Sequence, residues 1–241
     1  MTLIINDLEI LSPPKEYASF HGTSIFTTMR TCNKNILLWP RHAERLATHA
    51  TYFGFKNPGC EYLKARILRI LRTKTCEQKI RVILSDTNWA LNFEDLELLD
   101  SNIYNGVDIY ISSYQTHPQL RFFKTSNRLP YMLAAKEAQQ QGAFEALLLD
   151  SHGFISDGSR TSLMLYDGQS LVALKGGLEG CMRQEVLEYA KSLGVNIKYA
   201  YKKAQELDGQ LLLANSIIGV VPVGDIKYDF VSHIINYFRV L

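Results

Sequence analysis

The chain has 241 residues, of which 46% are hydrophobic and 21% are charged, and its formal net charge is +2. This length suffices for one large domain or two modest ones with real cores, and the composition is that of an ordinary globular protein. No basic run interleaved with aromatic residues favours nucleic-acid binding, and the longest apolar stretches have the length of strands and are too short to span a bilayer.

The first half of the chain alternates between helical and β patterns. Apolar residues at helical spacing predict a helix that begins near Arg41 and ends at the Gly54 breaker, and a second helix over 61–71. Strands are expected at 3–6, 25–31, 35–38, 80–84 and 107–113. We therefore predict an α+β domain over residues 1–113.

A polar joint that contains Pro118 is predicted at 114–120, followed by a second domain at 121–241. Within that domain the pattern predicts helices at 127–141 and 181–193, and strands at 146–149, 162–166, 170–173 and 211–213. We expect a functional site between the two domains.

Cysteines and histidines suggest no metal chemistry. The cysteines form no CxxC pair and have no histidine at ligand spacing, so we expect free thiols and no metal site. The histidines lack HxH, HExxH or Gly-x-Ser-x-Gly partners, which leaves a hydrolase or metalloenzyme without support. The first residues lack the basic and apolar regions of a secretory signal, so we expect a cytoplasmic protein.

Lys124 stands just before the helical pattern of 127–141. A buried amine at the end of a strand, with its pKa lowered by neighbours, can form an imine with an aldehyde cofactor or a carbonyl substrate. Most lysines are solvated, so Lys124 taken alone is better explained as a surface residue. Other segments of the chain single it out.

Segments spread over nearly the whole chain resemble the motifs of fold-type IV pyridoxal-phosphate enzymes. This class IV aminotransferase family includes branched-chain and D-amino acid aminotransferases and aminodeoxychorismate lyase. The segments are 20–30 (FHGTSIFTTMR), 38–46 (LWPRHAERL), 124–129 (KTSNRL), 150–162 (DSHGFISDGSRTS) and 214–223 (ANSIIGVVPV). The resemblance implies a two-domain α+β or α/β fold, with a small N-terminal domain and a larger, pseudobarrel-like C-terminal domain. It also implies pyridoxal 5'-phosphate as cofactor, a small-molecule substrate and a homodimer.

The resemblance gives each reactive group of the cofactor a partner in the chain. Lys124 would form the imine and then move protons as a base, and Arg45 would offer two donors to the phosphate. Asp157 stands where the family carries a glutamate that keeps the pyridine nitrogen protonated. Its side chain is one methylene shorter, so the ring must lie closer or a water must bridge. Two alternatives stay open, in which Asp157 merely starts an Asp-Gly turn and Arg45 pairs with a glutamate on the helix surface.

Two further segments are predicted to bind the phosphate. Gly180, Cys181 and Met182 begin a helix, where glycine lets the backbone approach and N–H groups point at an anion. Asn215 and Ser216 follow a strand and would add donors from the opposite side. The alternatives are an ordinary glycine-bounded helix start and a plain strand-to-turn cap.

Two details favour aminodeoxychorismate lyase within the family. The strand 26–30 (FTTMR) resembles the lyase's Phe-Thr-Thr more than the aminotransferases' Phe-Glu, and Asn-Arg-Leu at 127–129 stands where aminotransferases more often carry Asn-Tyr-Leu. Arg128 would then replace a phenol near the cofactor ring. We expect release of pyruvate and 4-aminobenzoate, a step of folate biosynthesis that needs no amino acceptor. The alternatives are a branched-chain or D-amino acid aminotransferase and a non-catalytic member of the fold.

The residues that bind the substrate are the least defined. Many relatives carry an arginine in the loop after the strand 80–84 that grips a substrate carboxylate, but this chain has none over 85–91 (SDTNWAL). The candidates for that role are Arg30, Arg128, Arg160 or a residue of a partner subunit, and Trp89 is a candidate to line the site. Arg160 has a structural alternative, because a similar Ser-Arg-Ser-Asn run occurs in relatives of differing specificity.

Overall fold

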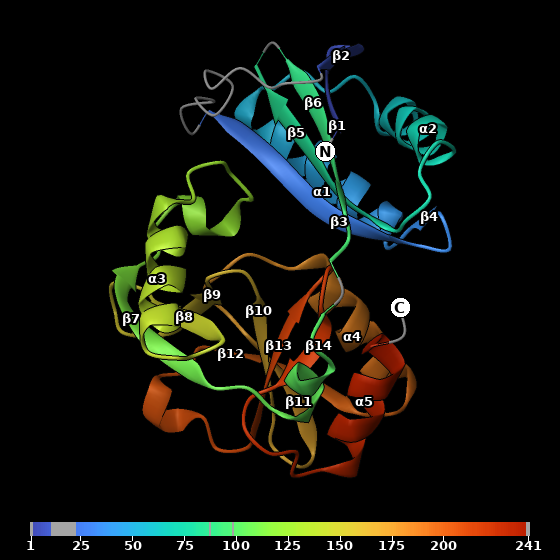
Figure 1. The fold of residues 1–241 in the computed structure, drawn as a ribbon. Coiled ribbons are helices and arrows are strands. Elements are labelled where there is room, and N and C mark those ends of the chain that lie inside the picture. Colours follow the sequence, from blue (N-terminus) through green and yellow to red (C-terminus); the bar gives the residue numbers. More distant parts are fainter. Residues whose placement is uncertain (1, 11–22, 87, 98, 240–241) are drawn as a thin grey trace. The chain divides into compact units, whose positions relative to one another are not determined.

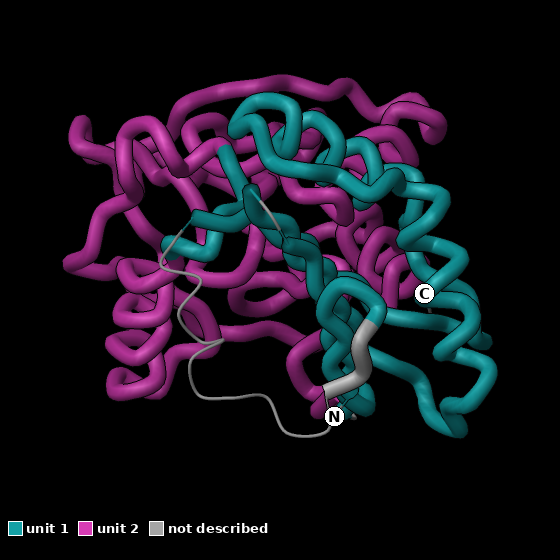
Figure 2. Tube along the Cα trace, turned by 90° about the horizontal axis from the view of Figure 1, so that it is seen from above, with its two compact units in different colours: residues 1–98, 123–127 teal, residues 99–122, 128–241 magenta. Residues whose placement is uncertain are grey.

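The computed structural model describes residues 2–10, 23–86, 88–97 and 99–239. The chain divides into two compact units, one formed by 1–98 with 123–127 and the other by 99–122 with 128–241 (Figure 2). Lys124 therefore belongs to the first unit. The joint predicted at 114–120 lies inside the second unit, and the domain boundaries drawn from the sequence stay a prediction.

The first unit is an antiparallel sheet covered on one face by two helices (Figure 1). Its strands lie in the order β2-β1-β6-β5-β3-β4. The elements are β1 (Thr2–Ile5), β2 (Leu8–Ile10), β3 (Ser24–Cys32), β4 (Asn35–Ile36), α1 (Trp39–Phe53), α2 (Cys60–Leu71), β5 (Gln78–Ser85) and β6 (Trp89–Asp95). The predicted helices and most of the predicted strands of this half are confirmed.

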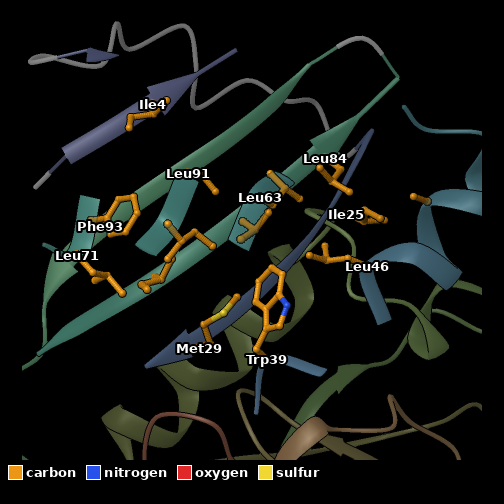
Figure 3. Close-up of a cluster of buried hydrophobic side chains, with 14 residues drawn as sticks. Ile4, Ile25, Met29, Trp39, Leu46, Leu63, Leu71, Leu84, Leu91 and Phe93 are labelled. Atoms are coloured by element: carbon orange, nitrogen blue, oxygen red, sulfur yellow. The ribbon is translucent and has the colours of Figure 1, made fainter. Parts of the chain in front are cut away.

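The core of the first unit follows from strand alternation. Ile25 and Met29 of β3 point to the same face of the sheet and are fully buried. Leu84 of β5 is fully buried as well. They pack in one cluster with Leu46 of α1 and Leu63 of α2 (Figure 3). Burial of a side chain of this size contributes about 2 kcal/mol, so this face fixes which side of the sheet α1 covers.

Two local features set the limits of α1 and β6. Gly54 adopts φ 67 and its N–H caps the end of α1, as the predicted breaker requires. The loop expected over 85–91 is shorter than predicted, because β6 already begins at Trp89. Leu91 and Phe93 alternate into the core while their backbone pairs with β5 and β1, which makes this segment a strand.

The second unit combines two sheets with three longer helices within the described residues. One sheet has the order β12-β11-β10-β13-β14 and the other β7-β8-β9. α3 packs on β7 and β8, α4 packs on β11 and β13, and α5 packs on β14. The elements are β7 (Ile109–Gln115), α3 (Leu129–Gln140), β8 (Glu145–Leu149), β9 (Ile155–Gly158), β10 (Ser162–Tyr166), β11 (Ser170–Leu174), α4 (Cys181–Ser192), β12 (Asn196–Ala200), β13 (Gln210–Asn215), β14 (Gly219–Pro222) and α5 (Asp229–Arg239).

Short 3-10 turns complete this unit, at Ser101–Asn105, Leu120–Phe122 and Ala204–Glu206. None of the helices in the described part of the chain has the length and apolar character needed to cross a membrane.

Candidate active site

Lys124 is half-buried in a short segment that is joined to β3. The Phe26 N–H donates to the Lys124 carbonyl at 2.8 Å, and the Ser126 N–H donates to the Ser24 carbonyl at 2.8 Å. These bonds form an antiparallel bridge between Ile25 and Thr125. The lysine is therefore held by its backbone to the central sheet of the first unit.

Helix α1 holds the same segment from the other side. The Lys124 N–H donates to His49 Nδ1 at 3.3 Å. The ring of Phe123 contacts His49, Tyr52 and Phe53, with centroid distances of 5.2, 4.3 and 4.9 Å. The Lys124 Nζ lies 5.4 Å from the centre of the Phe26 ring. The position of the lysine is thus set by both β3 and α1.

Arg45 joins a buried polar network between α1 and β3. Its Nη2 donates to Thr27 Oγ1, and Thr27 Oγ1 lies 2.6 Å from His42 Nδ1. Burial lowers the pKa of His42 well below its usual value, with smaller contributions from Arg45 and Lys124. His42 is therefore neutral at pH 7, and Arg45 and Lys124 are close enough to act on the same imidazole.

His49 is neutral as well. Burial, with a smaller contribution from Arg45, lowers its pKa to about 4. Because neither histidine is charged at pH 7, Arg45 and Lys124 supply the positive charge around them. An arginine and a lysine in this neighbourhood can attract an anion, which agrees with the predicted role of Arg45.

Asp157 lies in β9 of the second unit and is 5% exposed. Gly177 packs directly against it. A Cβ at Gly177 would come within 2.2 Å of the Ser156 carbonyl oxygen and 2.9 Å of Asp157 Cβ, so a larger residue would push β9 aside. Glycine at position 177 thus allows close approach of the chain to the predicted carboxylate.

Arg128 lies at the start of α3, in the same group of charges as Asp157. Its Nη2 donates to the Ser159 carbonyl at 2.6 Å, and its guanidinium carbon lies 3.5 Å from the centre of the Tyr131 ring. Burial lowers the pKa of Arg128, although Tyr131, Asp157 and Glu145 oppose this effect. Burial and the Asp157 charge also raise the pKa of Tyr131. The structure therefore brings the predicted residues Arg128 and Asp157 together.

Two charged residues near Asp157 were missed by sequence reasoning. Glu145 is buried and accepts hydrogen bonds from the Ser159 N–H at 3.0 Å and the Thr161 hydroxyl at 2.7 Å, which fixes the turn after β9. Arg183 is 5% exposed, and its Nη1 donates to the Leu174 carbonyl at 2.8 Å. For Glu145 the available signal was a single charged residue within the apolar run 143–149, whereas Arg183 precedes Gln184 and Glu185 and gave no such signal.

At the start of α4, backbone N–H groups are the groups that could bind a phosphate, and the side chains are not. Gly180 is the N-cap, no side chain caps this end, and the Cys181 and Met182 side chains are buried. A Cβ at Gly180 would come within 2.5 Å of Ser162 Oγ. Any phosphate contact of Gly180, Cys181 and Met182 would therefore use N–H groups.

Asn215 acts as a cap in the turn after β13. Its Oδ1 accepts from the Ile217 and Ile218 N–H groups at 2.8 and 2.9 Å, and its Nδ2 donates to the Arg160 carbonyl at 3.2 Å. This is the arrangement expected of the strand-to-turn alternative. Ser216 is buried beside it.

The predicted substrate residues of the first unit, Arg30 and Trp89, lie in different surroundings. The Arg30 Nε donates to the Thr31 carbonyl at 3.4 Å. Trp89 packs edge-on against Tyr62, with ring centroids 5.9 Å apart. Both rings line a hollow of about 350 Å³, and no other predicted site residue is among the described residues that line it. The hollow therefore does not connect Trp89 with Lys124.

Arg160, the substrate candidate in the second unit, is half-exposed and lies over the ring of Phe144 at 4.7 Å. Its backbone N–H donates to Glu145 at 3.4 Å. These contacts fit the structural alternative for Arg160.

The two units have the mixed α/β fold of the fold-type IV enzymes. The family model of amino-transferase class IV matches residues 24–226, and the chain belongs to this family. The fold predicted from the sequence is confirmed.

Relatives of the chain include both aminotransferases and lyases. A protein of Rickettsia bellii named "Probable branched-chain-amino-acid aminotransferase" is 26% identical, over 81% of this chain and 77% of its own. The aminodeoxychorismate lyase of Vibrio harveyi is 23% identical, over 94% of this chain and 93% of its own.

Solved structures divide in the same way. A candidate 4-amino-4-deoxychorismate lyase is 35% identical with a TM-score of 0.88, and the match covers 95% of both chains. A branched-chain amino acid aminotransferase that was solved with pyridoxamine 5'-phosphate has the same fold at 20% identity. Its TM-score is 0.83, and the match covers 98% of this chain and 92% of that one.

Proposed function

We propose that this chain is a pyridoxal-phosphate-dependent 4-amino-4-deoxychorismate lyase, which releases pyruvate and 4-aminobenzoate. The class IV family and its neighbours, one of them solved with pyridoxamine 5'-phosphate, indicate pyridoxal phosphate as the cofactor. The observation that carries the lyase activity is the half-buried Arg128, grouped with Asp157 and stacked on Tyr131. The relative at 35% identity supports the same choice.

The residues of each unit fit the cofactor by their chemistry. In the first unit Arg45 and Lys124 both lower the pKa of the buried His42 and therefore lie near the same side chain. A cofactor with a phosphate and an aldehyde needs an arginine and a lysine near each other in this way. In the second unit Asp157 is buried, and the backbone at Gly177 packs so closely against β9 that a side chain at this position would clash. The donor set therefore suits a phosphorylated pyridine aldehyde.

The chain's residues then divide the work. When bound, the cofactor supplies an aldehyde for the substrate amine and a ring that accepts electrons. Lys124 Nζ would accept the proton from the substrate Cα, and Arg45 would hold the phosphate. Asp157 would keep the ring nitrogen protonated, and the Arg128 guanidinium would provide the positive charge for a substrate carboxylate.

A branched-chain or D-amino acid aminotransferase is the second candidate function, because aminotransferases are among the relatives at 26% identity. A non-catalytic member of the fold is the third. The reactions differ in their need for an acceptor, since the lyase releases both products without a keto acid and a transaminase does not.

The deciding experiment measures pyruvate and 4-aminobenzoate released from aminodeoxychorismate by protein loaded with pyridoxal phosphate, with no keto acid present. We expect the two products in equal amounts, and loss of at least about a thousandfold in rate in Lys124→Ala because the base is removed. Lys136→Ala, which alters an exposed lysine of α3, is the matched control and should keep the rate.

No release by protein that binds the cofactor would contradict the lyase and direct the work to amino donors. Undiminished release by Lys124→Ala would contradict the role of Lys124. Protein that neither binds the cofactor nor releases product would favour the non-catalytic alternative.

A further inference from the structure

The network around Arg45 contains two buried polar residues to which the proposed mechanism gives no role. Thr27 on β3 and His42 on α1 are both 0% exposed. Leaving such groups in a core is costly unless they are hydrogen-bonded, and here the hydroxyl and the imidazole bond to each other at 2.6 Å. An apolar pair would fill the same space, so their retention needs an explanation.

The donors and acceptors of this network can be assigned. A guanidinium only donates, so Thr27 Oγ1 accepts from Arg45 Nη2 and its own hydrogen is available for His42 Nδ1. Arg45 Nη2 also lies 3.5 Å from the same His42 Nδ1. With both neighbours donating, His42 Nδ1 carries no hydrogen and the imidazole is the neutral Nε2–H tautomer. The lowered pKa of His42 agrees with this assignment.

A second consequence of the assignment is that the Nε2–H of His42 points into the core. His42 Nε2 is buried and has no hydrogen-bond partner among the described residues. Burying an Nε2–H without a hydrogen-bond partner costs stability, and a histidine that only filled space in the core would gain nothing in return. His42 does gain a hydrogen bond, because its Nδ1 contacts Thr27. The imidazole is therefore retained for its Nδ1 acceptor.

We propose that Thr27 and His42 are positioning residues that hold the Arg45 guanidinium for the phosphate of the cofactor. His42 orients the Thr27 hydroxyl, and the hydroxyl fixes one nitrogen of the guanidinium. A free arginine side chain loses rotamer entropy when it binds an anion, so a guanidinium fixed in advance binds the anion more tightly. This inference rests on the proposed function of Arg45.

The test compares binding of pyridoxal phosphate and of pyridoxal, which lacks the phosphate, to cofactor-free protein. The measured quantity is the ratio of the two dissociation constants, determined by equilibrium dialysis and independent of turnover. Thr27→Val keeps the branched shape in β3 and removes the hydroxyl. We expect it to reduce the preference for pyridoxal phosphate about tenfold, with pyridoxal binding unchanged.

Two variants of His42 separate its acceptor from its bulk. The Asn Oδ1 occupies the place of the histidine Nδ1 along the side chain, so His42→Asn should retain most of the preference. His42→Leu fills the space without an acceptor and should reduce the preference as Thr27→Val does. Thr31→Val is the matched control. Thr31 is also buried on β3, farther along the same face, but it bonds to Glu77 and to the Gln78 N–H.

The outcomes separate the inference from the function on which it rests. Arg45→Gln should lower the preference for pyridoxal phosphate more than Thr27→Val does, and in the Arg45→Gln background Thr27→Val should have no further effect on it. If Arg45→Gln leaves the preference intact, the proposed role of Arg45 fails and this inference fails with it. If Arg45→Gln lowers the preference while Thr27→Val and His42→Leu do not, or if pyridoxal binding falls equally, only the positioning role is overturned.

Discussion

Arg183 carries a buried charge in α4 that only the folded chain connects with Asp157. Burial lowers the pKa of Arg183, and Asp157 and Glu179 oppose that effect, so the guanidinium and the carboxylates attract each other. Arg183 also donates to the carbonyl at the end of β11. Removing the Arg183 guanidinium leaves the buried Asp157 carboxylate with less compensating positive charge, which we expect to cost about 3 kcal/mol.

We therefore predict that Arg183→Met lowers the free energy of unfolding by about 3 kcal/mol, measured by urea unfolding. In the double variant Arg183→Met with Asp157→Asn, the total loss should be smaller than the sum of the two single losses, because the second change removes the uncompensated charge. Arg183→Lys should retain part of the stability. Strictly additive losses would show that Arg183 and Asp157 act independently.

At this scale the sequence predicted residues that a motif marks and missed residues that only packing marks. Arg45, Lys124 and Asp157 stand in segments with recognisable spacing, and their roles stay predictions. Arg183 looks like a residue of a solvated face until α4 packs on the strands. Asn215 caps the turn after β13, which is the alternative already given from the sequence, and its contact with a phosphate stays a prediction.

Helix α1 carries two buried titratable side chains, His42 and His49. Burial lowers the pKa of both histidines, that of His49 to about 4, whereas an unfolded chain titrates near 6.5. The unfolded state therefore binds more protons than the folded state below this pH. Stability is full above about pH 6.5 and falls as the pH decreases, by up to about 1.4 kcal/mol per pH unit for each proton.

We predict that the free energy of unfolding falls between about pH 7 and about pH 5, where few carboxylates titrate. His49→Gln and His42→Asn should each flatten the slope of this loss, measured by urea unfolding over the same range. His152→Gln, a change at an exposed histidine, should leave the slope as it is. A wild-type stability that stays constant over this range would contradict the buried neutral state of both rings.

The elements were predicted where periodicity is strong and missed where burial hides it. The boundaries of β10 and the start of α4 agree with the sequence pattern, and α1 and α2 differ from it by one or two residues. The missed strands include β6, β9, β12 and β14. β14 is buried on both faces and so lacks a polar alternation, β9 is a buried strand of mostly polar residues, and β12 is an edge strand with no buried residue. The amphipathic helix α5 was also missed.

The sequence did not reveal that the chain leaves the second unit at residue 122 and returns to the first unit for residues 123–127. Residues 123–127 come after β7 of the second unit in the chain, yet they pair with β3 of the first unit. No local pattern encodes such a return, because it depends on hydrogen bonds between residues about a hundred positions apart. The family motif located Lys124 even though the predicted boundary at 121 separated it from its sheet.

We propose that the chain forms a homodimer. Large apolar side chains of the second unit stay exposed, among them Leu129 at 62% and Met132 at 66%, which lie three residues apart on one face of α3. Exposed apolar side chains that gather on one face are typical of a protein interface. We predict a molar mass about twice the 27.4 kDa of the chain, measured by light scattering after gel filtration.

Leu129→Glu with Met132→Glu should shift the protein toward the monomer by placing like charges on this face, at least about tenfold in dissociation constant. The control is Leu193→Glu, which adds a charge at another exposed leucine, 48% exposed, beyond the end of α4, and it should leave the mass unchanged. A wild-type mass of one chain would contradict the dimer. A dimer that dissociates in Leu193→Glu and persists in the α3 double variant would move the interface away from α3, because the added charges act only where a partner excludes water from them.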